Sequence, residues 1–199
     1  MATMLATPGT LLRGGEWAIE PKLDGWRAMV EVRETVTIHT RSGRDITDRL
    51  PDLQHLRSAI DGRSATFDGE LIVGEGRPAD FYKVGPTLIA KRPSAIITFA
   101  AFDLVELDGE SLIGLTYSER RSRLDGLLEA GPAWVRIPSF VGDAGAIFVE
   151  CVKAGLEGVV AKRCSSRYQP GKRSTDWLKC KAPGWRDEHG GRRHQGGSR

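Results

Sequence analysis

The chain has 199 residues, of which 40% are hydrophobic, so it can bury the core of one large domain or of two small ones. Its net charge is only +3, but basic residues crowd positions 162–199, which indicates a partner that carries phosphate. The three cysteines lack metal-ligand spacing, which argues against a zinc site, and their odd number favours a reducing cytosol. No apolar run is long enough to predict a signal peptide or a membrane span.

The first part of the chain predicts short strands after an irregular beginning. Residues 1–16 are rich in Gly, Thr and Pro and show no sustained periodicity, so we expect a lead-in whose Met4 packs on the core. Alternation of apolar and polar residues then predicts strands over residues 17–22, 27–33 and 36–40. Regularly spaced leucines predict a short packing helix that begins near Pro51.

The stretch from Glu20 to Arg27 has the spacing K-x-D-G-x-R. Alternate side chains of a strand share a face, so we expect Glu20, Lys22 and Asp24 on one side before Gly25 lets the chain turn. A lysine amine near other cations or shielded from water can be a nucleophile toward phosphorus or a carbonyl carbon. By itself, the stretch fits a solvated strand face with weak ion pairs as well.

Two more polar groups follow along the chain. Arg41 lies beside Ser42-Gly43, where a basic side chain can reach a phosphate or ribose while the backbone turns away. Two apolar pieces, residues 65–67 and 70–73, predict strands that Asp68-Gly69-Glu70 interrupts. Because Asp-Gly is most often an acidic turn, the triplet alone assigns no site.

The middle of the chain contains several breaks and then its most apolar run. A helix is expected to start at Pro78, and the residues up to Pro86 should end it early. Residues 95–107 predict a central strand. Phe102 within this strand is equally well interpreted as a core side chain or as a ring that stacks on a base.

The next segments predict scaffold helices. Thr116-x-x-Glu119 has the pattern of a capping box, followed by inward apolar residues. A second helix is expected over residues 144–154, where Ile147, Phe148, Cys151 and Val152 would be buried before Gly155 ends it.

Two strands with charges at alternate positions are expected near the end, over residues 157–162 and 177–181. Lys179 and Lys181 would share one strand face, from which two amines can hold one phosphate group. Glu157 on the opposing strand offers a carboxylate of the kind that Mg²⁺ binds together with substrate phosphate oxygens.

Taken in this order, the segments resemble the nucleotidyltransferase domain of ATP-dependent DNA ligases, which are related to RNA ligases and mRNA capping enzymes. The similar elements are K-x-D-G-x-R, R-x-G, D-G-E, F-D, E-G-v-v-x-K and L-K-x-K, within residues 20–181. The link at residues 168–174 resembles the Y-x-P-G-[KR]-R-S of bacterial DNA ligases, which favours DNA over capping chemistry. The chain departs from the family over residues 74–93, where related ligases have a longer helix with a glutamine and an arginine.

The short strands without a β-α-β rhythm predict an α+β fold, and the resemblance implies two mainly antiparallel sheets flanked by helices around a nucleotide-binding cleft. It also implies that Lys22 attacks the α-phosphorus of ATP to form a lysyl-AMP. The adenylate would then pass to a DNA 5′-phosphate and be displaced by a 3′-hydroxyl in DNA repair.

The resemblance implies a role for each site residue. The expected nucleotide-binding residues are Glu20, Leu23, Arg27, Arg41, Glu70, Phe102, Val160, Lys179 and Lys181. Glu157 and Asp24 are expected to hold Mg²⁺, and Lys162 and Arg173 to contact DNA. The expected substrates are ATP and nicked double-stranded DNA.

We expect residues 1–185 to form the adenylation domain and the Gly-, Arg- and His-rich residues 186–199 to be a disordered basic tail. The OB-fold domain into which such ligases continue is absent from this sequence, so weak activity of the chain alone is expected, with a separate OB-fold or repair protein as a possible partner. Two alternatives stay open: a ligase-like module that binds DNA or a partner with little turnover, and an RNA ligase. We expect a cytoplasmic, nucleoid-associated location and no membrane contact.

Overall fold

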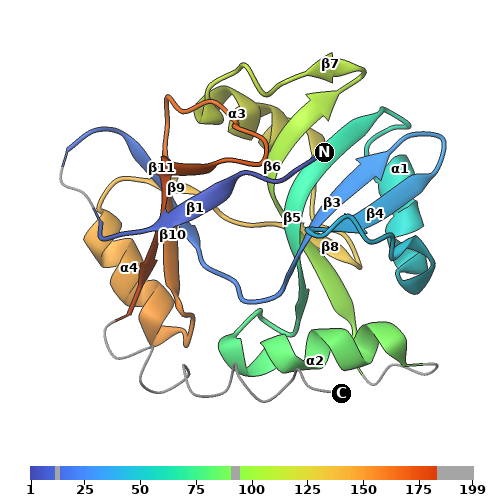
Figure 1. Ribbon diagram of the computed structural model, residues 1–199, viewed down its shortest axis with the longest axis horizontal. Coiled ribbons are helices and arrows are strands. Elements are labelled where there is room, and N and C mark those ends of the chain that lie inside the picture. Colours follow the sequence, from blue (N-terminus) through green and yellow to red (C-terminus); the bar gives the residue numbers. More distant parts are fainter. Residues whose placement is uncertain (12–13, 91–94, 183–199) are drawn as a thin grey trace.

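The computed structural model describes residues 1–11, 14–90 and 95–182 of the chain. Two β-sheets lie side by side and the helices lie on their outer sides (Figure 1). This arrangement confirms the predicted α+β class. The predicted tail at residues 186–199 lies outside the described residues.

The first sheet has the strand order β1-β11-β10-β2-β9. Its neighbours pair antiparallel, except that β1 runs parallel to β11. The α4 helix (Ala144–Lys153) packs on β2 and β10. The strands are β1 (Leu5–Pro8), β2 (Trp17–Pro21), β9 (Phe140–Val141), β10 (Gly158–Arg163) and β11 (Arg173–Lys181).

The second sheet has the order β4-β3-β5-β6-β7, and β8 adds a parallel pairing to β6. The α2 helix (Pro78–Ile89) packs on β5 and β6, and α3 (Tyr117–Leu127) packs on β6. A short helical stretch, η1 (Thr47–Arg49), η2 (Pro51–His55) and α1 (Leu56–Ala59), follows β4. The strands are β3 (Trp26–Val32), β4 (Val36–Thr40), β5 (Ala65–Val73), β6 (Ile97–Leu107), β7 (Glu110–Ser111) and β8 (Trp134–Arg136).

Two strand predictions are wrong. The lead-in was expected to be irregular, but its residues form β1, which pairs with β11. The prediction failed because the partner strand lies more than a hundred residues away in the sequence and leaves no local signal. The triplet Asp68-Gly69-Glu70 is not a turn but the middle of one continuous strand, β5. A Cβ on Gly69 would lie 2.4 Å from the ring of Phe99 and 2.7 Å from the carbonyl oxygen of Ala100, so the glycine permits close packing against β6.

The α2 helix does not end early, as its proline predicts, but continues through Pro86. Val84 and Leu88 are buried against the second sheet, and Ala90 donates to the carbonyl of Pro86 at 3.1 Å. Burial of this face therefore offsets the backbone hydrogen bond that a proline removes from a helix.

The other predicted helices form where expected. Thr116 and Glu119 make both hydrogen bonds of a capping box at the start of α3. The α4 helix begins at Ala144, and Asp143 caps it by accepting from two backbone N–H groups. Burial on α4 is weaker than predicted, because only Cys151 is fully buried and Ile147, Phe148 and Val152 are half-buried.

An apolar cluster joins the two sheets and includes residues from both ends of the chain. Met4, Phe102, Tyr168 and Trp177 are all buried in it, which confirms the expected packing of Met4. The rings of Phe102 and Tyr168 each meet Trp177 edge-on, with centroids 6.3 and 5.8 Å away. The cluster fixes the spacing of the sheets behind the site described below.

A fully buried ion pair lies between α3 and β6. Both Arg120 and Asp103 are 0% exposed, and two guanidinium nitrogens reach the two carboxylate oxygens at 2.8 and 2.9 Å. A further nitrogen of Arg120 donates to the carbonyl oxygens of Leu115 and Ser166. The pair anchors the residue that follows Phe102 in the chain.

We predict that Arg120→Met destabilises the fold by about 3–5 kcal/mol, because it leaves the Asp103 carboxylate buried without its partner. Lys153→Met should cost about 0–1 kcal/mol, since its ion pair with Glu150 is solvent-exposed. Urea unfolding of both variants and the wild type measures the difference. Equal losses would contradict the buried pair's role.

Candidate nucleotide-binding site

A cavity of about 240 Å³ opens between the two sheets. Residues of both sheets line it, and most of the residues predicted for the nucleotide are among them. The predicted residues at its wall are Glu20, Lys22, Leu23, Arg27, Arg41, Glu70, Phe102, Val160, Lys162, Arg173 and Lys179. Their roles stay predictions, but the structure brings them together.

Strand register explains how one end of the cavity gathers cations. Lys22 follows β2 directly, and its backbone N–H donates to the carbonyl of Gly158 at 3.0 Å, while Gly158 lies opposite Lys181. Glu157 immediately precedes β10 and is 1% exposed. Its two carboxylate oxygens form ion pairs with the amines of Lys22 and Lys181, which are 17% and 24% exposed.

Two residues further along these strands, a second row of residues lies on the same face of the sheet. Val160 of β10 lies between Glu20 of β2 and Lys179 of β11. Burial, together with the charges of Arg173, Lys181 and Lys22, lowers the pKa of the Lys179 amine. Although burial opposes it, the pairing with Lys22 and Lys181 lowers the pKa of Glu157. This end of the cavity is therefore suited to an anion.

The opposite wall belongs to the second sheet. Arg27 lies beside Glu70 in the β3–β5 register and makes a bidentate ion pair with the buried Asp68 at 2.5 and 2.6 Å. Burial raises the pKa of Glu70 to about 7, partly opposed by Arg27 and Lys22 and supported by Asp24 and Asp68. The wall thus presents one fixed cation beside a carboxylate that titrates near neutral pH.

Gly25 lies at a bend of the chain, as expected, and also allows a close approach to β5. A Cβ at this position would lie 2.2 Å from the carbonyl oxygen of Leu71. Asp24, next to it, donates its backbone N–H to the carbonyl of Gly76 at 2.8 Å. Lys22 is therefore tied to the first sheet, Asp24 to the turn that follows β5, and Arg27 to the second sheet.

The apolar end of the cavity contains Phe102, 7% exposed, with the Arg27 guanidinium carbon 4.4 Å and the Lys162 amine 4.3 Å from its ring centroid. Lys162 is only 1% exposed and forms an ion pair with Glu20 at 2.7 Å. This burial does not fit the DNA contact predicted for Lys162. Strand β10 lies inside the sheet, between β2 and β11, so neither of its edges is free.

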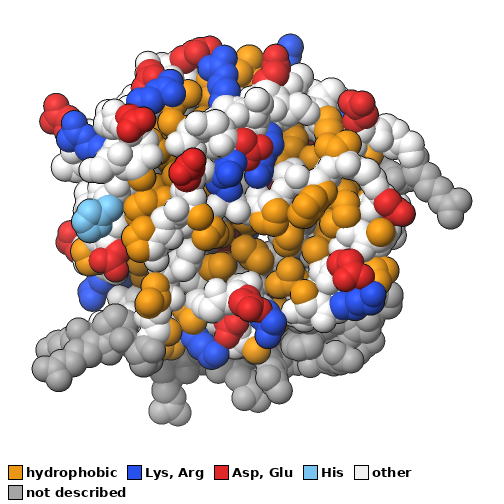
Figure 2. Space-filling model, turned by 180° about the vertical axis from the view of Figure 1, so that it is seen from behind, with side chains coloured by type: hydrophobic (Ala, Val, Ile, Leu, Met, Phe, Trp, Pro, Cys, Tyr) orange, Lys and Arg blue, Asp and Glu red, His pale blue; other side chains and the backbone are white. Residues whose placement is uncertain are grey.

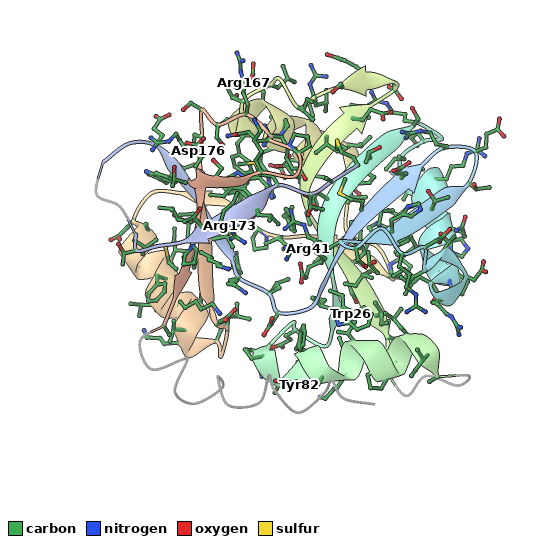
Figure 3. All side chains as sticks on the ribbon, in the orientation of Figure 1. Trp26, Arg41, Tyr82, Arg167, Arg173 and Asp176 are labelled. Atoms are coloured by element: carbon green, nitrogen blue, oxygen red, sulfur yellow. The ribbon has the colours of Figure 1, made fainter. Side chains whose placement is uncertain are left out.

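Arg41 and Arg173 lie on opposite sides of the space between the sheets (Figure 3). Both side chains are exposed, and Arg173 donates to the carbonyl of Ala6 at 2.5 Å. They place positive charge at the rim of the cavity.

Several residues of the site carry no signal in the sequence that would have revealed them. Leu5, Ala6, Ile137 and Trp177 also line the cavity. Trp177 had the period-2 pattern of a strand, but its contact with the site depends on how the sheets meet.

The acidic side chains fit a Mg²⁺ ion that is shared with a bound nucleotide. Within the described ranges, no group of three or more His, Cys, Asp or Glu side chains could hold a metal by itself. Glu157 Oε2 is buried and has no hydrogen-bond partner among the described residues apart from its ion pair with Lys22. One carboxylate plus phosphate oxygens and water is the coordination that Mg²⁺ commonly takes in nucleotide sites.

Comparison with known proteins agrees with this geometry. The family model for the ATP dependent DNA ligase domain matches residues 3–181. The chain belongs to the ATP-dependent DNA ligase family. The predicted resemblance is thereby confirmed.

Individual relatives of this ligase domain include repair proteins. It is 37% identical to the multifunctional non-homologous end joining DNA repair protein LigD of Mycobacterium tuberculosis, over 96% of this chain and 26% of that protein. It is also 37% identical to DNA ligase 1 of Korarchaeum cryptofilum, over 89% of this chain and 36% of the relative. The chain thus spans about a quarter to a third of these proteins.

Solved structures show the same ligase fold. The ligase domain of M. tuberculosis LigD superposes with a TM-score of 0.79 at 38% identity, over 90% of this chain and 60% of that one. A mycobacterial DNA ligase D complexed with ATP and MES gives 0.78 at 37% identity, with the same coverage. No helix in the described part of this ligase domain is long and apolar enough to cross a bilayer.

The pKa of Glu70 generates a test of the site's electrostatics. A carboxyl whose pKa is about 7 in the folded chain, against 4.5 ordinarily, binds its proton more tightly when folded. The free energy of unfolding should therefore fall as pH rises from about 4.5 to about 7. Glu70→Gln should lose this part of the fall. Denaturant unfolding of both proteins across the range measures it, and parallel pH curves would contradict the assignment.

Proposed function

We propose that this chain catalyses the adenylation chemistry of an ATP-dependent DNA ligase, with Lys22 as the nucleophile. The observation that carries the proposal is the Glu157 carboxylate, which pairs with Lys181 and with Lys22, a residue of the cavity wall. A lysine held beside a phosphate-binding cation is in place to attack phosphorus. Lys22 follows β2 directly, and Lys181 is the last residue of β11 in the same sheet.

The two ends of the cavity suit the two ends of ATP. Phe102 offers a ring face for adenine, and Glu20 offers an acceptor for its amino group. Arg27, Arg41 and Glu70 lie where ribose and phosphate would follow. Lys179 and Lys181 then stabilise the charge that grows on the phosphoryl oxygens as the bond to pyrophosphate breaks.

In the free protein, the Lys22 ammonium is paired with Glu157. An ammonium has no lone pair, so Lys22 must leave this ion pair and lose a proton before it attacks the α-phosphorus. Glu157 and Asp24 would hold Mg²⁺ once a nucleotide supplies phosphate oxygens. Bound there, Mg²⁺ would neutralise phosphate charge.

The adenylate on Lys22 then passes to a DNA 5′-phosphate, and a 3′-hydroxyl displaces AMP to seal the nick. LigD, a relative, is described as an end-joining DNA repair protein, which supports a repair role here. The work would take place in the cytoplasm at the nucleoid, with an OB-fold domain or a repair protein as partner.

Nicked duplex would bind across the rim of the cavity, where Arg41 and Arg173 are exposed. The face that Figure 2 shows is less suited to it. Figure 2 shows that, among the described residues of that face, Lys and Arg are interspersed with Asp and Glu around apolar side chains. A polyanion is attracted more strongly by cations that are not paired with acids.

Incubation with α-labelled ATP tests the assignment of Lys22. We predict that label attaches to the wild-type chain and not to Lys22→Ala. Lys22→Arg should fail equally, because a guanidinium keeps the charge but is no usable nucleophile. Since the relatives are longer, the assay is run on the chain by itself and on the chain with the OB-fold domain of a related ligase added.

Sealing of a nick that already carries adenylate serves as a control for folded, DNA-competent protein, because this step does not require Lys22 as nucleophile. If label never attaches under either condition, or attaches equally to Lys22→Ala, the catalytic assignment fails and a DNA- or partner-binding module replaces it.

Salt dependence tests the DNA surface. Affinity for nicked duplex should fall steeply as salt rises, since phosphate contacts release counterions. Arg173→Gln should reduce the slope of log K against log salt by about one. Arg63→Gln, which removes an exposed arginine that does not line the cavity, should leave the slope unchanged. A flat salt response of the wild type would argue against this surface.

A further inference from the structure

A buried polar network lies behind the base end of the cavity. Glu20 lines the cavity but is only 2% exposed, and each of its carboxylate oxygens has a donor. The Tyr117 hydroxyl, from the first turn of α3, donates to Oε1. The Lys162 amine, from β10, lies 2.7 Å from Oε2. Both donors are 1% exposed, so neither is a surface contact.

Lys162 links this carboxylate to the aromatic wall. Its amine donates to the backbone carbonyl of Phe102 at 3.1 Å and lies 4.3 Å from the centroid of the Phe102 ring. It also lies 4.4 Å from the Trp177 ring. One buried ammonium thus fixes both the group that would read a base edge and the ring that would stack on the base.

Two further polar side chains contact the Tyr117–Glu20 pair. Ser139 Oγ lies 3.0 Å from the Tyr117 hydroxyl, and Arg121 Nη1 lies 3.8 Å from Glu20 Oε1. Every charged or hydroxyl group that faces Glu20 in these contacts is a donor or a cation. Burial raises the pKa of Glu20, and these donors and cations oppose that rise by stabilising the carboxylate.

The hydrogen-bonding capacity of Glu20 then decides which base fits. An ionised carboxylate accepts about four hydrogen bonds and donates none, so two donors leave acceptor capacity toward the cavity. Adenine presents an amino donor at its 6-position, whereas guanine presents a carbonyl acceptor there. A fixed carboxylate accepts from the first and is unpaired against the second.

We propose that Tyr117 and Lys162 are positioning residues that hold Glu20 as an oriented, acceptor-only carboxylate and thereby set the preference for adenine over guanine nucleotides. The proposal rests on the proposed use of this cavity for ATP. To that proposed function it adds the two side chains, Tyr117 and Lys162, that set which base is bound. Neither side chain needs to touch the nucleotide for this role.

Equilibrium binding of nucleoside monophosphates tests the proposal without turnover, by calorimetry on the 199-residue chain. The ligands are AMP, GMP and purine riboside monophosphate, which lacks the 6-amino group. The wild type should bind AMP at least about tenfold more tightly than either of the others, the size expected for one hydrogen bond to a charged acceptor.

Tyr117→Phe removes one oxygen and should weaken AMP binding on the order of tenfold while leaving the affinity for purine riboside monophosphate unchanged. Lys162→Met removes the partner of the other Glu20 carboxylate oxygen and is a second, separate test. It should also remove the preference for AMP over GMP. Thermal unfolding of each variant establishes that it is folded.

Tyr168→Phe is the matched control. It also removes a buried hydroxyl that donates to a carboxylate, Asp68, but it does not touch Glu20. It should change the affinities for all three ligands by the same factor. Equal weakening of AMP and purine riboside monophosphate in Tyr117→Phe, or no weakening, would overturn the positioning role, as would a wild type that does not prefer AMP.

The outcome is independent of catalysis. Absence of lysine labelling with a selective AMP site would remove the proposed reaction and leave this inference standing. Labelling of Lys22 without the expected selectivity would do the reverse.

Discussion

The carboxylate of Asp68 holds the two sheets in the relation on which the site depends. It is 0% exposed in the middle of β5 and accepts a bidentate pair from Arg27 and a 2.5 Å hydrogen bond from Tyr168, which follows β10 in the first sheet. The Tyr168 hydroxyl also accepts the backbone N–H of Met4 at 3.0 Å. Burying a charge costs free energy unless the charge is hydrogen-bonded. If the sheets moved apart, the Asp68 carboxylate would lose its partners and the fold would be destabilised.

The chemistry of the cavity follows from that constraint and from strand register. Once the sheets are fixed, Lys22, Gly158 and Lys181 lie in one row across three neighbouring strands, and Glu157 is drawn between the two amines. The other end is built in the same way, because Glu20 lies opposite Val160, two residues from that row, and Phe102 of the second sheet lines the same cavity. In the proposed binding mode, the base of a nucleotide would meet Glu20 and Phe102 and its phosphates would meet the lysines. In the proposed reaction, Lys179 and Lys181 would stabilise the transition state, whereas Lys22 first has to leave its ion pair with Glu157.

Much of this could be predicted from the sequence, and the misses have a common cause. Lys22, Glu70, Phe102 and Lys179 belong to short segments whose spacing is itself the signal, and the structure gathers all four at one cavity. Strand β1 and the burial of Lys162 could not be predicted, since both depend on pairing between distant segments rather than on local pattern. Tyr117 and Tyr168 were missed as site partners for the same reason. The helix α2 shows the converse, because its local proline signal was overridden by burial of Val84 and Leu88.

The central claim is that the amine of Lys22 forms the covalent bond to AMP. Peptide mapping by tandem mass spectrometry, after incubation of the chain with ATP and Mg²⁺ and gentle digestion, locates that bond directly. The account predicts an AMP adduct on the peptide that contains Lys22, with fragment ions that assign it to this side chain, and its loss when excess pyrophosphate reverses the reaction. An adduct on Lys179 or Lys181, with Lys22 unmodified, would contradict it.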